Sequence, residues 1–107
     1  MTDLEITKLC AEAIGWHPHS VSDKVLYNRE LLDSIPLETW NPIHDDAQAM
    51  ALVKKLRLHV VAPDREDGWW EVYPWNHDQI NGFKASLNFA VCECVAKMQL
   101  EKQKVAA

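Results

Sequence analysis

LHVVAPDREDGWWEVYPW, residues 58–75, contains two strand-forming runs around a polar centre. Residues 58–63 and 69–75 are rich in β-branched and aromatic side chains, which favour β-strands. Residues 64–68 between them are polar and end in a glycine, which is typical of a turn. The stretch therefore predicts an antiparallel β-hairpin, and we expect a small antiparallel sheet to be built around it.

The second run of this hairpin has two different faces, because side chains alternate along a strand. Trp70 and Val72 would share one face. The other face would carry Trp69, Glu71, Tyr73 and Trp75. Since the Glu71 carboxylate prefers water, we predict that Trp70 and Val72 are the residues that face the core.

Exposed clusters of tryptophan and tyrosine are typical of binding surfaces. The candidate ligand-binding or partner-binding residues are therefore Trp69, Glu71, Tyr73 and Trp75. The alternative is that a second helical layer covers this face and makes these side chains part of the core.

Three segments have helical patterning: about residues 3–14, 46–57 and 83–102. Thr2 with Glu5, and Asp45 with Gln48, have the spacing of capping boxes, in which side chains bond the first backbone N–H groups of a helix. Gly15 is placed to end the first helix. The first two helices each have one apolar stripe, so each is expected to pack on one side.

The last helix has apolar residues on two opposite sides. One stripe contains Leu87, Ala90, Val91, Cys94 and Met98, and the other contains Ala85, Phe89, Cys92, Ala96 and Leu100. The helix should therefore be covered twice, once by the sheet and once by the first helix or by a second copy of the chain. We favour the first helix, because a domain usually buries such a helix within itself. A homodimer through the last helix is the alternative.

Residues 17–44 have weak patterning and are interrupted by three prolines. Short strands at 25–27 and 37–40 and a helical turn at 28–34 are the elements that this segment suggests. We otherwise expect irregular structure, which at this length is typical of a functional loop. Together these elements predict an α+β protein, a helix-sheet-helix (α/β/α) sandwich, with residues 1–107 forming a single domain.

Composition restricts the partners. The 107 residues carry a net charge of −5 and no dense basic cluster, so we expect no nucleic-acid partner. No apolar run reaches the roughly 18 residues that span a bilayer, and the N-terminus has no pattern of a secretory signal, so we expect no membrane partner. The three cysteines fall in helical patterns, which fits buried thiols in a reducing cytoplasm.

The sequence contains little that supports an enzymatic function. Imidazole and carboxylate groups suit metal ions such as zinc or manganese, and the candidate donors are His17, His19, His44 and Asp45. Their spacing argues against a metal site, because no His-x-x-x-His pair lies on a helix and Asp45 already has a capping role. No phosphate-binding glycine motif is present. We therefore expect no catalytic residues and no cofactor.

The order of several short motifs resembles a known family. The matching stretches are Ala13-Ile14-Gly15-Trp16, then Trp40-Asn41-Pro42-Ile43-His44-Asp45-Asp46-Ala47-Gln48-Ala49-Met50, and Ala90-Val91-Cys92-Glu93-Cys94-Val95. In these the chain is similar to the phage ABA sandwich domain of small phage and prophage proteins. Residues 17–37 have no counterpart in that pattern, and the last helix is longer. The resemblance implies a helix-sheet-helix sandwich and a phage or prophage origin, and it carries over no catalytic residues.

These observations lead to two hypotheses of different classes. The first is a small non-enzymatic phage accessory protein that binds a host protein or a small ligand in the bacterial cytoplasm, where it could counteract host defence. The second is a small metal-dependent hydrolase or nucleotide-processing enzyme that uses the loop histidines and aspartates. We favour the first.

Overall fold

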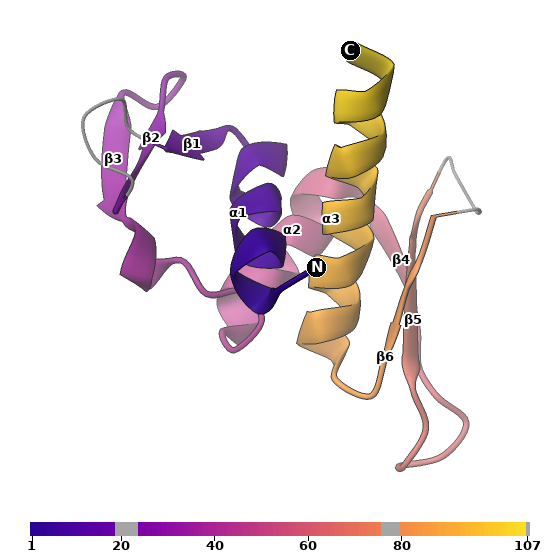
Figure 1. Cartoon of the computed structure of the whole chain (residues 1–107). Helices are drawn as coiled ribbons and strands as arrows, with labels where there is room; N and C mark the ends of the chain where they lie inside the picture. Colours follow the sequence, from indigo (N-terminus) through magenta and orange to yellow (C-terminus); the bar gives the residue numbers. More distant parts are fainter. Residues whose placement is uncertain (19–23, 76–79, 107) are drawn as a thin grey trace.

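The computed structural model describes residues 1–18, 24–75 and 80–106, which form helices and two antiparallel sheets (Figure 1). The elements, in chain order, are α1 (Asp3–Ala13), β1 (Trp16–Pro18), β2 (Val25–Asn28), β3 (Asp33–Pro36), the 3₁₀ helix η1 (Leu37–Thr39), α2 (Asp46–Leu56), β4 (Leu58–Val61), β5 (Trp70–Pro74), β6 (Gly82–Lys84) and α3 (Leu87–Ala106). Strands β1, β2 and β3 form sheet A, and β4, β5 and β6 form sheet B. The predicted α+β class is confirmed, and helices alternate with sheets along the chain in helix-sheet-helix order.

The predicted hairpin is the centre of sheet B. β4 and β5 pair antiparallel, with Leu58 opposite Pro74 and Val61 opposite Glu71. β4 begins directly after α2 because Arg57 adopts the left-handed conformation, with φ 54°, and so turns the chain sharply at the end of the helix.

The predicted helix caps are also confirmed. The Thr2 side chain accepts a hydrogen bond from the Glu5 N–H at 3.1 Å, and the Asp45 carboxylate accepts one from the Gln48 N–H at 3.0 Å. Gly15 follows α1 with φ 93°, which a glycine adopts without strain. Gln48 differs from a full capping box, since its side chain bonds the backbone of the preceding loop instead of the start of its own helix.

Sheet A occupies the segment for which we expected irregular structure. The strand predicted at 25–27 is present as β2, but the predicted helical turn at 28–34 is wrong. There the Asn28 side chain accepts hydrogen bonds from the N–H groups of Glu30 and Leu31, at 3.0 and 3.1 Å, and holds a turn between β2 and β3. The strand predicted at 37–40 is a short 3₁₀ helix instead.

The last helix starts later than predicted. Residues 82–84, where the helix was expected to begin, form strand β6 on the other side of β5. α3 then begins at Leu87, because the Ser86 hydroxyl accepts a hydrogen bond from the Phe89 N–H at 3.3 Å and so caps it.

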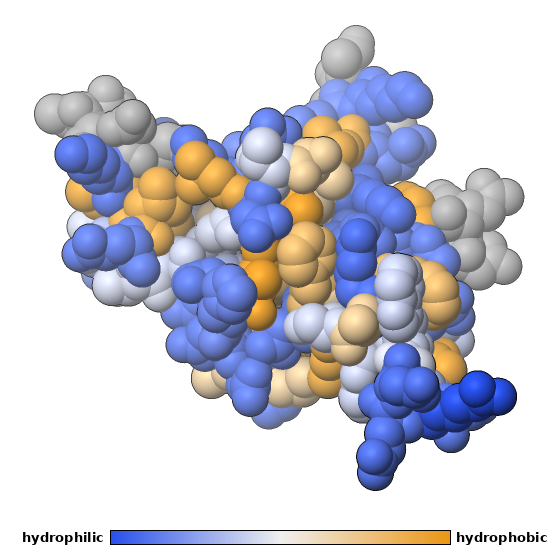
Figure 2. Space-filling model, turned by 60° about the horizontal axis from the view of Figure 1, so that its bottom comes forward, coloured by the Kyte–Doolittle hydropathy of each residue, from blue (hydrophilic) through white to orange (hydrophobic). Residues whose placement is uncertain are grey.

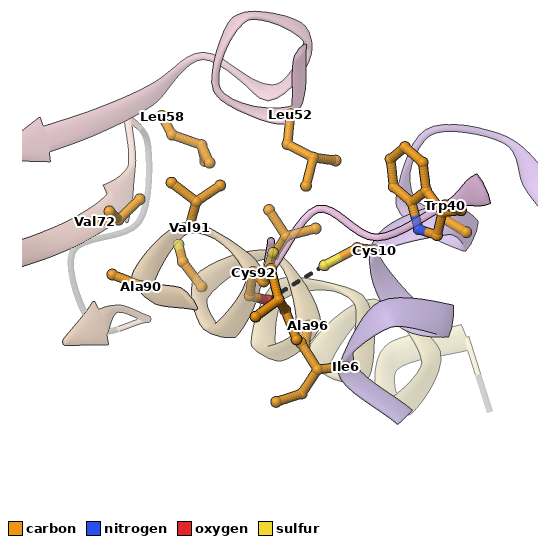
Figure 3. Close-up of a cluster of buried hydrophobic side chains, with 14 of the residues drawn as sticks. Ile6, Cys10, Trp40, Leu52, Leu58, Val72, Ala90, Val91, Cys92 and Ala96 are labelled. Atoms are coloured by element: carbon orange, nitrogen blue, oxygen red, sulfur yellow. Dashed lines mark hydrogen bonds between the residues drawn. The ribbon is translucent and has the colours of Figure 1, made fainter. Parts of the chain in front are cut away.

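α3 lies between sheet B and the other two helices, and the central residues of both apolar stripes are buried within the chain (Figure 3). The ends of the second stripe are not covered, since Ala85 precedes α3 and is exposed and Leu100 is 41% exposed. Ala90 and Val91 point toward Val72 and Leu58 of sheet B. On the opposite side, Cys92 and Ala96 lie toward α1, with the Cys10 thiol donating to the Cys92 carbonyl at 3.4 Å. The favoured expectation, that the first helix covers the second stripe, is confirmed. Neither α3 nor any other helix in the described ranges combines the length and apolar character that crossing a membrane requires.

Candidate functional site

The two faces of sheet B have opposite environments. Val72 is fully buried and Trp70 packs partly buried against the core, as predicted for these two residues. Trp69 and Trp75, which the alternation of side chains assigns to the opposite face, are 50% and 60% exposed. No helix among the described residues covers these two side chains, so the alternative that they belong to the core is wrong.

Strand register places a group of side chains together on this exposed side. His59 lies opposite Tyr73, while Val61, Glu71 and Phe83 form one row across the three strands. Trp69 joins this row through a ring contact with Phe83. We call this group of six residues, His59, Val61, Trp69, Glu71, Tyr73 and Phe83, the aromatic face. Trp75 directly follows β5 at its far end.

Two ring pairs give the aromatic face its shape. The His59 and Tyr73 rings are stacked, with centroids 5.1 Å apart and planes at 8°. The Trp69 and Phe83 rings meet at a tilt of 54°, with centroids 5.2 Å apart. Phe83 is itself 48% exposed, so this second pair is open to an incoming group.

A hollow of about 380 Å³ lies at the end of the aromatic face where β4 turns into β5. Its walls are Val61, Ala62, Pro63, Asp64, Arg65, Gly68, Trp69, Glu71 and Phe83. We call it the aromatic hollow. The charged turn beside it projects at the lower right of Figure 2, where strongly hydrophilic side chains border paler and hydrophobic ones.

Within the part of the chain that the structure describes, the carboxylate of Glu71 forms no ion pair and no hydrogen bond. Glu71 is nevertheless half-buried between its neighbours in the sheet. A charge in this position is fixed by a strand and remains available to a ligand.

Glu93 on α3 holds the β6 side of the aromatic face in place. Its carboxylate accepts the Phe83 N–H at 3.0 Å and lies 3.2 Å from the Lys84 ammonium and 3.6 Å from that of Lys97. Burial acts to raise the pKa of Glu93, but the Phe83 N–H and the two lysines outweigh it and leave the pKa below its ordinary value. Phe83 therefore sits on a backbone that is anchored to α3.

The sequence predicts three residues of the aromatic face, Trp69, Glu71 and Tyr73, together with the adjoining Trp75. It does not predict the other three, His59, Val61 and Phe83. Phe83 was assigned to the start of the last helix, because residues 82–84 are too few to show a strand pattern. The Ser86 cap, with a hydroxyl three residues before Phe89, was the signal that could have moved the helix start and left Phe83 to a strand.

A larger hollow, of about 690 Å³, lies between the start of α1 and the segment around η1. Its lining consists of Leu4, Thr7, Lys24, Pro36, Leu37, Glu38, Trp40 and Asn41. Two polar groups of its wall are already used: the Trp40 indole N–H donates to the Thr7 carbonyl at 2.9 Å, and the Thr7 hydroxyl donates to the Asp3 carbonyl. The volume suits a small molecule, which would be held mainly by apolar contact.

The weak metal candidates are not assembled into a site. His17 lies in β1, His44 precedes α2, and Asp45 caps α2. In residues 1–18, 24–75 and 80–106, no three or more His, Cys, Asp or Glu side chains are grouped so that they could hold a metal ion. His19 lies outside the described residues.

The three cysteines are free and buried. The hydrogen-bonding interaction with Cys92, together with burial, raises the pKa of the Cys10 thiol, and burial raises that of Cys94 to about 12. A nucleophilic cysteine needs a lowered pKa, which is the opposite of what Cys10 and Cys94 have, and all three thiols are buried in the core.

No family model matches this chain, and comparisons with curated proteins and with solved structures find no match either.

Proposed function

We propose that this chain is a small non-enzymatic binding protein that uses the aromatic face of sheet B to bind a partner protein. The observation that carries the proposal is the exposure of Trp69, Phe83 and Trp75 along one open side of a three-stranded sheet. Large exposed aromatic groups cost solubility, and they are typical of the residues that dominate protein interfaces.

The construction of the sheet supports a binding role. Trp70 and Val72 anchor β5 to the core on its inner side, and Glu93 anchors β6 through the Phe83 N–H. The aromatic groups are thus presented by a preorganised backbone, which reduces the entropy lost on binding.

The biological setting is proposed from the resemblance to the phage ABA sandwich domain. On that reading the chain is a phage or prophage accessory protein, it acts in the bacterial cytoplasm, and its partner is a host protein, such as a component of host defence. The genes beside it test this part of the proposal, since a phage gene cluster supports it and a housekeeping operon contradicts it.

Site-specific photo-cross-linking tests the binding surface. A photoreactive phenylalanine analogue is placed singly at Trp69 or Trp75 and, as a control, at Leu32, which is 79% exposed in the turn between β2 and β3. In the bacterium that carries the gene, the two sheet positions should cross-link to the same protein, and Leu32 should not. A partner reached only from Leu32, or none reached from either tryptophan, contradicts the proposal.

A variant with Trp69→Ala, Tyr73→Ala and Trp75→Ala separates binding from folding. We expect it to keep a cooperative unfolding transition and to lose the partner, because these side chains lie on the exposed side of the sheet. Loss of cooperative unfolding would instead assign them to the core.

The 690 Å³ hollow between α1 and η1 favours a second candidate function, the binding of a small apolar molecule. To test it, a small-molecule library is screened for compounds that raise the melting temperature of the protein. The screen is repeated with the Leu37→Lys variant, whose charged side chain would occupy the hollow. Stabilisation that is equal in both would place the ligand elsewhere.

A further inference from the structure

We infer that the aromatic hollow binds the cationic side chain of a lysine or arginine that stands among apolar residues in a segment of the partner protein. This inference rests on the proposed function and specifies the chemistry of the partner. It follows from three features of the hollow: two tilted rings, an unpaired carboxylate, and the net charge of its walls.

The rings provide the first feature. Trp69 and Phe83 meet at 54°, so their faces are not stacked flat on each other and both are about half exposed. A cation within about 6 Å of a ring centroid is attracted to the electron-rich face, most strongly for tryptophan. In the described part of the chain, the cation that lies over an aromatic ring is Lys84, over Phe89, so the chain supplies none to Trp69 or Phe83.

Glu71 provides the second feature. It stands beside Phe83 in the same row of the sheet and lines the same hollow as Trp69. A carboxylate that is half-buried and has no partner in the described ranges favours a cation and repels an anion. An incoming ammonium or guanidinium group would form a salt bridge that Glu71 does not make with any of the described residues.

The sign of the charge decides between a cation and an anion. Arg65 also lines the hollow, but it lies in the exposed turn, whereas Glu71 is fixed in β5. Asp64, in the same exposed turn, offsets the charge of Arg65, so the Glu71 carboxylate leaves the walls with a net negative charge. The whole chain, at −5, has the same sign.

The occupant is a side chain of a protein segment because the hollow does not stand alone. Beyond the hollow, the same sheet carries the stacked His59 and Tyr73 rings, and the exposed Trp75 directly follows β5. A free small cation would use the hollow and leave this remaining aromatic area exposed. A segment with one basic residue among apolar ones would cover both.

Peptide titration provides the test, with Trp69 indole N–H shifts in NMR spectra as the readout. The probes are a capped pentapeptide with a central lysine flanked by leucine and glycine, the same peptide with arginine or with uncharged norleucine, and tetramethylammonium chloride. We expect saturable shifts with the lysine and arginine peptides and at least about fivefold weaker binding of the norleucine peptide, the usual scale of a cation–π contact with an added charge.

Matched variants assign the effect to the hollow. Glu71→Gln should weaken binding of the lysine peptide about fivefold or more, whereas Glu66→Gln removes the same charge from the nearby turn, outside the hollow, and should leave it unchanged. Phe83→Leu, read by the same Trp69 signal, should also weaken it, and urea unfolding of each variant confirms that the fold is kept.

Three results would overturn the inference: equal binding of the norleucine peptide, equal effects of the Glu71→Gln and Glu66→Gln substitutions, or tetramethylammonium binding more tightly than the lysine peptide. The proposed function fails separately. If Trp69 still cross-links to its partner in the Glu71→Gln variant with undiminished affinity, the aromatic face binds a partner but not through a cation. If neither tryptophan cross-links, the surface itself is misassigned.

Discussion

Gly82 of β6 lies directly against the Ala90 carbonyl of α3, and a β-carbon at Gly82 would overlap that carbonyl. Because the contact is between two backbones, neither side can yield without moving a whole element. We expect Gly82→Ala to lower the free energy of unfolding by about 3 kcal/mol, the upper part of the range for overpacking. Urea unfolding measures it, and Ala85→Gly, the reverse change at a nearby exposed position, should cost less than about 1 kcal/mol. An unchanged midpoint for Gly82→Ala would contradict the packing of β6 on α3.

Arg57 ends α2 in the left-handed conformation that favours glycine. An ordinary side chain there costs about 1 kcal/mol. We therefore expect Arg57→Gly to raise the free energy of unfolding by about 0.5–1 kcal/mol, as measured by urea unfolding. Arg57→Ala removes the same charge without relieving the backbone, so it should not stabilise the protein. Equal effects of the two substitutions would assign the change to charge.

Glu93 makes stability depend on pH. Its pKa is lowered in the folded state, so its ionised form stabilises the fold above the unfolded pKa of about 4.3, and this contribution is lost as the pH falls through the folded pKa. Glu93→Gln should lower the free energy of unfolding at pH 7 by about 1–2 kcal/mol, because hydrogen bonds to a charged group are lost.

The pH profile provides the check on this assignment. The difference between the native chain and Glu93→Gln should shrink as the pH is lowered from about 5 toward 3. Glu66→Gln, at an exposed turn residue, should show no such difference at any pH. If the difference in free energy of unfolding between the native chain and Glu93→Gln stays constant with pH, Glu93 stabilises the protein by packing alone.

The buried thiols should be unreactive in the folded protein. Since the pKa of Cys94 is raised to about 12 and that of Cys10 is also raised, these two thiols form almost no thiolate at pH 8, and burial shields all three thiols from the reagent. A chromogenic disulfide reagent should therefore titrate three thiols in urea. With the native protein it should react only at the rate at which the protein transiently unfolds. Rapid reaction of one thiol in native protein would contradict this packing.

The features predicted from sequence are those governed by neighbours in the chain. The Thr2 and Asp45 caps act over three residues, and the alternation of Trp70 and Val72 is a property of any extended strand. The two stripes of α3 likewise follow from helical geometry alone. Each of these patterns is read from short spacings, and the structure confirms each.

The sequence predicts β2 of sheet A but not β1, β3 or β6, which are only three or four residues long and lie outside any longer strand-forming run. The turn after β2 depends on the Asn28 side chain, which accepts hydrogen bonds from the backbone N–H groups of Glu30 and Leu31. Such a turn leaves no periodic pattern in the sequence. Phe83 is absent from the predicted site because its strand, β6, is too short to show a strand pattern. A strand of three residues is defined by the neighbour it pairs with.

Local sequence patterns thus determined the caps, the hairpin, the aromatic side of β5 and the double stripe of α3, since these depend on spacing and on the preference of each side chain. Tertiary structure decided which elements cover which faces. It placed α3 on the Val72 side of sheet B and left Trp69 exposed, and it brought Phe83 to Trp69 from 14 residues away along the chain. The physical reason is that burial depends on the assembled core: one face of sheet B packs against α3, and in the described part of the chain Trp69 and Phe83 stay about half exposed on the opposite face.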